Sequence, residues 1–232
     1  MAGAPRQSST RTGRGAAPLD AAGRRLALGG VVGCVGFVVA WAVAGANTAG
    51  YSPVDDAISR LAAQHAPHRV LMTAGFVAFG LGLPAYALAL RKALAGWAWV
   101  TACATGIATL GVALAPLDTT AGDRFHNVFA IIGYVTLAAT PLLAIGPFVR
   151  RAAPGWARYS AATGAVSGGA LLATTAGPLH GLLQRAGLGI SDVWVVVTAL
   201  QMWRFGRLPG RTSGLPASPH ESVGGAARPP TP

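Results

Sequence analysis

Long apolar segments separated by short charged stretches dominate this chain. Breaking the sequence at its charges leaves six apolar segments, at about 26–46, 70–90, 96–116, 127–149, 160–180 and 190–205. Most are close to the roughly 20 residues that a helix needs to cross the hydrocarbon of a bilayer. Each must be helical, since a helix satisfies its own backbone hydrogen bonds where no water is present. The pattern predicts an all-α, polytopic membrane bundle of six transmembrane helices.

The composition supports a membrane environment. Hydrophobic residues make up 52% of the chain and charged residues 11%, whereas about a quarter of the residues of soluble domains are charged. The net charge of +11 could indicate nucleic acid, but the cationic residues are not gathered on one soluble module. We therefore expect membrane lipid as a partner and no nucleic acid.

The distribution of cationic residues predicts the orientation of the bundle. Most of the 18 Lys and Arg residues fall in the two tails, in the second connection or in the fourth. The positive-inside rule then places both termini in the cytoplasm. The richness in Ala and Gly and the preference for Arg over Lys are typical of a GC-rich bacterium, so we expect a multi-pass protein of the cytoplasmic (inner) membrane.

Composition also divides the chain into three parts. Residues 1–23 are predicted to be a disordered basic cytoplasmic tail, 24–205 the membrane domain, and 206–232 a second disordered cytoplasmic tail. Within the membrane domain, Gly29 with Gly33 and Gly164 with Gly168 have the small-xxx-small spacing that lets helices approach closely. We interpret these pairs as helix-packing positions, and a homo- or hetero-oligomer through the glycine-rich faces is possible.

The first connection, "YSPVDDAISRLAAQHAPHR" at 51–69, is unusually rich in titratable groups. Ser52 followed by Pro53 and Asp55 resembles the start of a helix. The apolar residues after it recur at helical spacing, which predicts a short amphipathic helix on the outer face. Asp55 and Ser59 would lie on the edge of this helix that turns toward the bundle.

The outer-face connections, at 47–69, 117–127 and 181–190, collect the potential chemistry. His126 lies one turn into the fourth helix at membrane depth, where an ionisable group is a functional candidate. Ser191 and Asp192 are interpreted as the cap of the sixth helix. No charge is then expected in the middle of a span, so no aqueous transport path is predicted.

Convergence of these outer groups would form one polar pocket, because burying His126 or Arg185 near lipid without partners is costly. In this arrangement Arg185 pairs with Asp118 or Asp55, and His126 is the proton-transfer or ligand group. The alternative is that the same residues only hold the loops in place. The candidate ligand-binding residues are Asp55, Ser59, Asp118, His126, His180, Gln184 and Arg185.

A divalent metal such as zinc is a possible cofactor of this pocket. Its candidate ligands are His126, His180 and Asp118. The sequence contains neither an HxxxH nor an HExxH pair, so spacing does not define a metal site. Catalytic residues are unknown at this point.

The order of four motifs resembles a known family. "YSPVDDAISRLAAQHAP", "LMTAGFVAFGLGL", "PLDTTAGDRFHN" and "GLLQR" ahead of a Trp-bearing last span are similar to the family called domain of unknown function 998, over about residues 26–205. The resemblance implies a six-span bacterial or archaeal membrane protein. It emphasises Ser59, Leu61, Asp118, His126 and Gln184 with Arg185, and implies no particular activity.

Three functions remain open from the sequence. The leading hypothesis is a protein that binds a lipid or envelope molecule in an outer-face polar pocket. The first alternative is a metal-assisted membrane hydrolase that acts on lipid at the same face. The second is a structural or assembly subunit without chemistry.

Overall fold

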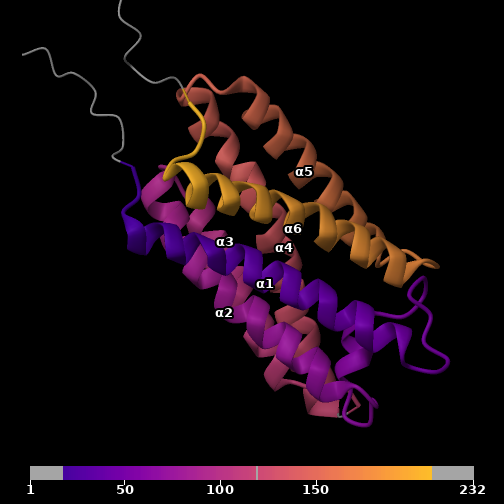
Figure 1. Cartoon of the computed structure of the whole chain (residues 1–232). Coiled ribbons are helices and arrows are strands. Elements are labelled where there is room, and N and C mark those ends of the chain that lie inside the picture. The colour runs from indigo at the N-terminus through magenta and orange to yellow at the C-terminus, as the bar shows by residue number, and fades with distance from the viewer. Residues whose placement is uncertain (1–17, 119, 211–232) are drawn as a thin grey trace, which may run out of the picture.

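The chain forms a bundle of six α-helices in the computed structural model, which describes residues 18–118 and 120–210. The helices are α1 (Ala21–Ala46), α2 (Arg69–Ala93), α3 (Ala98–Leu114), α4 (Thr120–Arg150), α5 (Pro154–Ala173) and α6 (His180–Phe205). A short 3-10 helix, η1 (Ile58–Ala62), lies between α1 and α2. Each α-helix packs on the next, and α1 also packs on α6, which closes the bundle (Figure 1).

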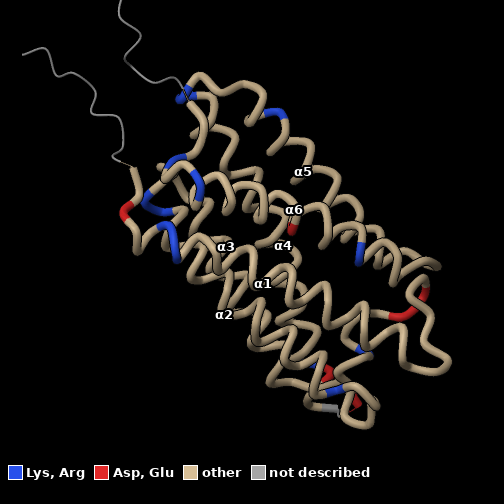
Figure 2. The backbone as a smooth tube through the Cα atoms, in the orientation of Figure 1, with Lys and Arg blue, Asp and Glu red and all other residues tan. Residues whose placement is uncertain are grey.

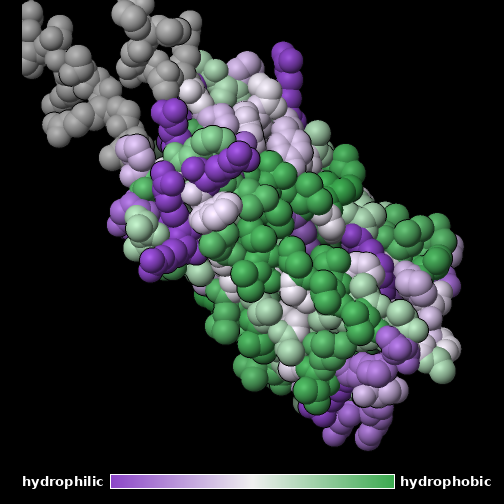
Figure 3. Space-filling view, viewed as in Figure 1, coloured by the Kyte–Doolittle hydropathy of each residue, from purple (hydrophilic) through white to green (hydrophobic). Residues whose placement is uncertain are grey.

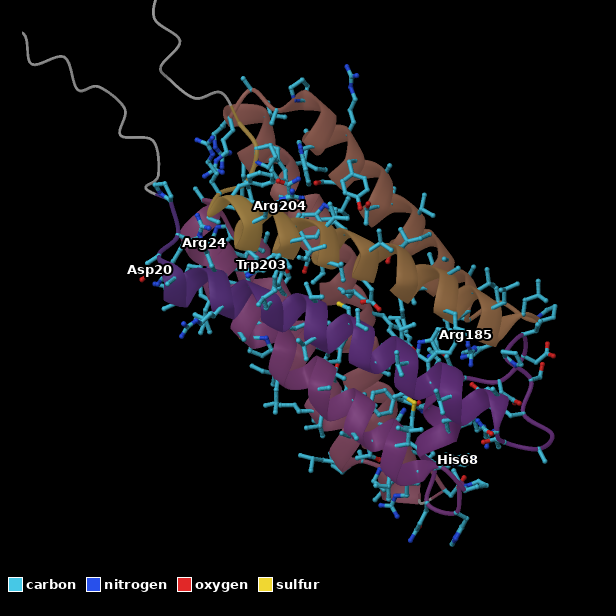
Figure 4. All side chains as sticks on the ribbon, viewed as in Figure 1. Asp20, Arg24, His68, Arg185, Trp203 and Arg204 are labelled. Atoms are coloured by element: carbon cyan, nitrogen blue, oxygen red, sulfur yellow. The ribbon has the colours of Figure 1, made fainter. Side chains whose placement is uncertain are left out.

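The two ends of the bundle differ in their charged residues (Figure 2). One end, called here the basic end, carries most of the cationic positions of the described residues. The residues at or near the start of α1 and the ends of α2, α4 and α6 that form it are Arg24, Arg25, Arg91, Lys92, Arg150, Arg151, Arg204 and Arg207. The opposite end, called here the loop end, holds segments 47–68, 115–118 and 174–179. Figure 4 labels Arg24, Trp203 and Arg204 at the basic end and His68 and Arg185 at the loop end.

A broad apolar surface lies between these polar ends (Figure 3). Four helices, α1, α2, α4 from Ala121 and α6, are long and apolar enough to cross a membrane. Helix α3 is apolar but has only 17 residues. A chain with several such helices is a multi-pass membrane protein, as its composition indicates.

The helices follow the predicted apolar segments, except around α5 and α6. Helix α5 begins at Pro154, where proline suits the first turn because its missing N–H needs no partner there. Helix α6 begins at His180, so the predicted connection at 181–190 is wrong. Its glycines do not form a turn; a Cβ on Gly187 would lie 2.6 Å from Leu171 Cγ on α5. Close packing against a neighbouring helix requires glycine here.

Part of each predicted tail packs on the bundle. The Asp20 side chain accepts a hydrogen bond from the Gly23 N–H at 2.8 Å and so caps α1. The Leu19 N–H donates to the Gly206 carbonyl at 2.7 Å, and Leu208 is buried. The rest of the predicted tails, 1–17 and 211–232, lies outside the described residues.

Glycines let α1 and α2 approach closely. A Cβ on Gly29 would lie 2.6 Å from the Gly82 carbonyl oxygen, and one on Gly82 would lie 2.4 Å from the Gly29 carbonyl oxygen. On α5, a Cβ on Gly164 would lie 2.4 Å from Leu142 Cγ on α4. Both small-residue pairs therefore lie at helix contacts within the chain. Oligomer formation stays a prediction.

Candidate functional site

A cavity of about 60 Å³ lies under η1 at the loop end. Its wall combines the aromatic rings of Phe37, Phe76, Phe79, Phe129 and Tyr134 with the polar side chains of Ser59, Thr105, Thr109, His126 and Gln184. A water molecule needs roughly 10–15 Å³ of such space, so the cavity holds a few waters or one small polar group. Three of the predicted site residues, Ser59, His126 and Gln184, thus line one space.

His126 is buried in the second turn of α4 and has one ring nitrogen free. Its Nδ1 lies 2.8 Å from the Ala115 carbonyl oxygen. Because a carbonyl only accepts, Nδ1 carries the proton, and in the neutral ring Nε2 is an acceptor. Nε2 has no hydrogen-bond partner among the described residues. The bond to Ala115 fixes the ring, and Nε2 is left for a ligand.

Gln184 joins two walls of the cavity. Its side-chain oxygen accepts a hydrogen bond from the Ile58 N–H at 2.8 Å, and its Nε2 donates to the Tyr134 hydroxyl. The first bond holds η1 over the cavity, and the second orients a ring of α4. Tyr134 is absent from the predicted site residues. The sequence signal that could have identified it is a hydroxyl group within an apolar segment, on the same helix as His126.

Arg185 holds the first connection to α6 through backbone contacts. Its Nη1 donates to the carbonyls of Pro53, Asp56 and Gly181 at 2.9, 3.0 and 2.8 Å, and its guanidinium lies 5.2 Å from the Trp41 ring centroid. The predicted ion pair with Asp118 or Asp55 is wrong, since the ion pair among the described residues is Lys92–Asp20. Carbonyls and an aromatic face hold this cation without a carboxylate, although its buried Nε has no hydrogen-bond partner among the described residues. Figure 4 shows Arg185 beside the first connection.

Tyr51 completes this anchor. Arg185 Nη2 donates to the Tyr51 hydroxyl, which in turn donates to the Ala57 carbonyl at 3.2 Å. Burial raises the pKa of the Tyr51 hydroxyl, although the nearby Arg185 acts in the opposite direction. The hydroxyl therefore stays protonated at neutral pH and can donate a hydrogen bond to the Ala57 carbonyl.

The short helix of the first connection begins later than predicted. Ser52 and Asp55 form a turn in which the Asp55 N–H donates to Ser52 Oγ at 3.2 Å and the Ser52 hydroxyl donates to Asp55 at 2.8 Å. The helix starts only at Ile58 and is a 3-10 helix. Its Ile58 and Leu61 side chains are buried. Arg185 donates to the carbonyls of Pro53 and Asp56, which precede this helix.

The remaining predicted site residues have local partners and do not line the cavity. Asp55 is exposed in the Ser52 turn. Asp118 is exposed at a positive φ of 78°, and its N–H donates to Asp123 at 3.0 Å. His180 Nδ1 donates to the Thr174 carbonyl at 3.0 Å. Among residues 18–118 and 120–210, no three His, Cys, Asp or Glu side chains are grouped to hold a metal, so His126, His180 and Asp118 do not form the zinc site considered above.

Asp192 is the main ionisable residue whose position differs from the prediction. It lies in the middle of α6 and is 3% exposed, so its interpretation as a helix cap is wrong. The expectation that no Asp, Glu, Lys or Arg lies in the middle of a span is also wrong, because Asp192 lies there. A carboxyl group inside an apolar helix was itself the signal that could have identified it.

A second, apolar groove lies between α4 and α5 and also has Tyr134 in its wall. It measures about 300 Å³ and is lined by Ile131, Tyr134, Val135, Ala138, Gly168, Leu171, Leu172 and Thr175. Tyr134 therefore borders both the polar cavity and this groove. Leu172, one of the lining residues, is 72% exposed, as suits a side chain that faces lipid.

Comparison with known proteins assigns the chain to a family but indicates no reaction. No curated protein and no solved structure matches it. The family described as "Protein of unknown function (DUF998)" matches residues 31–201, which include all six helices and η1 in whole or in part. This match covers most of the chain, and the protein is a member of the DUF998 family.

Proposed function

We propose that this protein binds a membrane amphiphile at its loop end, with a polar group in the cavity and an acyl chain in the α4–α5 groove. The observation that carries the proposal is the position of Tyr134, which borders both spaces. A ligand that passes this ring would have its polar and apolar parts in matching surroundings. A phospholipid or another envelope lipid has this chemistry.

The dimensions of the two spaces support this division. The cavity of about 60 Å³ is too small for a whole lipid, but it has room for a carbonyl, hydroxyl or phosphoryl group. His126 Nε2 and the Ser59 hydroxyl have no hydrogen-bond partners among the described residues. Both are available to a polar ligand. The groove offers mainly apolar side chains to a hydrocarbon chain.

The proposal includes a membrane topology with six crossings. Helix α3, with 17 residues, spans about 25 Å, and α5, with 20, spans about 30 Å. A hydrocarbon core of roughly 30 Å accommodates the shorter helix by local thinning. The cationic residues at the basic end favour the cytoplasmic side of a bacterial inner membrane, with both termini there. The cavity and groove then face the outer leaflet.

Photo-crosslinking tests the lipid site. The full-length protein is reconstituted in vesicles that contain phosphatidylglycerol with a diazirine in its acyl chain, and labelled peptides are identified by mass spectrometry. We expect preferential labelling of α4 and α5 at the groove. Gly168→Phe fills the groove, because a Cβ there comes within 3.7 Å of Ala138 Cβ, and should reduce this labelling several-fold.

Gly169→Phe is the matched control. This neighbouring glycine does not line the groove, and a Cβ on it meets nothing within 4 Å. Equal labelling of the two variants would contradict the proposal and favour the structural-subunit alternative. Release of free fatty acid from the bound lipid would instead favour the hydrolase alternative.

A further inference from the structure

Asp192 is a buried carboxyl group whose hydrogen bonds are incomplete. Its Oδ1 accepts a weak hydrogen bond from the Cys34 thiol of α1 at 3.7 Å. Its Oδ2 is buried and has no partner among the described residues. A buried polar atom without a partner is rare in proteins and requires an explanation.

Among residues 18–118 and 120–210, no cation pairs with Asp192 to balance an ionised carboxylate. Helix α1 contributes Cys34, and Tyr86 of α2 lies near that thiol. The Tyr86 hydroxyl is already bonded to Thr198 at 2.7 Å. Helix α5 presents Ser160 and Ser167, which bond to Trp194 and Ser191. An isolated carboxylate in such an interior takes up a proton rather than stay ionised.

The carboxyl group lies one helical turn from the cavity. On α6, Gln184 and Leu188 line the cavity, and Asp192 follows at the next i+4 position of the same face. On α1, Phe37 lines the cavity, and Cys34 precedes it by three residues. One turn corresponds to about 5 Å along the helix axis. Phe37 and Leu188 therefore separate the Asp192–Cys34 pair from the cavity.

We propose that Asp192 is a proton-binding site in the membrane interior that exchanges its proton through the cavity at the loop end. In the conformation described, the protonated Oδ2 hydroxyl lacks an acceptor. When a cavity water passes the Phe37–Leu188 layer, it accepts this proton and leaves a carboxylate and a hydronium ion. The ionised carboxylate then retains water, and the Cys34 thiol donates to it more strongly. Proton binding at Asp192 does not depend on the identity of the lipid ligand.

Infrared spectroscopy of the purified full-length protein tests the protonation state. A Cys103→Ala background leaves Cys34 as the single thiol, because the chain has two cysteines. In a detergent without carbonyl groups, we expect a protonated-carboxyl C=O band at neutral pH that Asp192→Asn removes. At alkaline pH this band should disappear, and the S–H band of Cys34 should shift to lower wavenumber.

Two further variants assign the carboxyl band to Asp192. Asp55→Asn changes an exposed carboxyl group and should leave the neutral-pH band unchanged. Cys34→Ala removes the thiol bond and should raise the wavenumber of the C=O band, which gives a readout even where Asp192→Asn fails to fold. A wild-type spectrum at neutral pH without a protonated-carboxyl band would overturn the proposal.

The exchange route has its own test. Ala130→Phe places a ring in the cavity and should slow the shift of the carboxyl band after transfer to heavy water several-fold. Val166→Phe, at an exposed site on α5 that lines neither the cavity nor the groove, should leave the rate unchanged. An unchanged rate in Ala130→Phe would exclude exchange through the cavity.

Discussion

Gln184 of α6 and Ile58 of η1 are joined by a 2.8 Å hydrogen bond from the Ile58 backbone N–H to the Gln184 side-chain oxygen. The same side chain also donates to the Tyr134 hydroxyl of α4. One buried glutamine therefore holds both the cover of the cavity and the ring between the cavity and the groove. Its loss would affect both at once.

Gln184→Leu should destabilise the protein, because it removes the hydrogen bonds of Gln184 to Ile58 and Tyr134. The change keeps a similar volume but leaves the buried Ile58 N–H without an acceptor, which costs about 1–3 kcal/mol. We expect a lower thermal unfolding midpoint in detergent, together with faster hydrogen exchange in 58–62. Gln64→Leu, at an exposed position of the same connection, is the control. Equal midpoints for the two variants would show that the Gln184 contacts do not stabilise η1.

His126→Asn should separate the anchoring role of this side chain from its ligand role. An asparagine amide nitrogen occupies nearly the position of Nδ1 and can donate to the Ala115 carbonyl, which now accepts from His126 at 2.8 Å. It has nothing at the position of Nε2. We therefore expect near wild-type stability but reduced labelling by the diazirine lipid. His126→Ala loses both groups and should also lose about 1 kcal/mol of stability. Full labelling of His126→Asn would show that Nε2 does not bind the ligand.

The sequence predicted the helices better than the site because hydropathy is a property of whole segments. Six apolar runs separated by charges correspond to the six helices, although α6 was truncated at its first turns. Its glycines and Arg185 are typical of a loop by local pattern alone. In the structure, a Cβ on Gly181 would lie 2.4 Å from the Asp56 carbonyl oxygen, so this glycine is required by a contact between segments distant in sequence. Local patterns do not reveal such a contact.

The same limit applies to the candidate site. His126, Ser59 and Gln184 could be brought together because each was placed at the same predicted end of the bundle. The sequence predicts a carboxylate partner for Arg185, yet its Nη1 donates to backbone carbonyls of the first connection. Which carbonyls point toward a side chain depends on irregular backbone that periodicity does not describe. The error at Asp192 followed from the incorrect start of α6.

Gly82→Ala should destabilise the α1–α2 contact. Its new Cβ would lie 2.4 Å from the Gly29 carbonyl oxygen and 2.9 Å from Gly33 Cα, and neither backbone can move without shifting a helix. Overpacking of this kind costs about 1–3 kcal/mol. Gly169→Ala is the matched control, because its Cβ meets nothing within 4 Å and alanine favours a helix. We expect a lower unfolding midpoint for the first variant and an equal or higher one for the second. The reverse order would contradict the close helix contact.

Single cysteines should reveal the topology, including the crossings by α3 and α5. We would place them at Gln64, Ala121, Gly155 or Ala176, all exposed, in the Cys103→Ala background, where the remaining Cys34 is buried. An impermeant thiol reagent should label positions 64, 121 and 176 in intact cells, because the loop end faces outward by the positive-inside rule. Position 155 should react only after permeabilisation, and the parent without added cysteines supplies the background. Labelling of 155 but not 64 in intact cells would show the inverted orientation, whereas labelling of 155 and 176 from the same side would show that α5 does not cross the membrane.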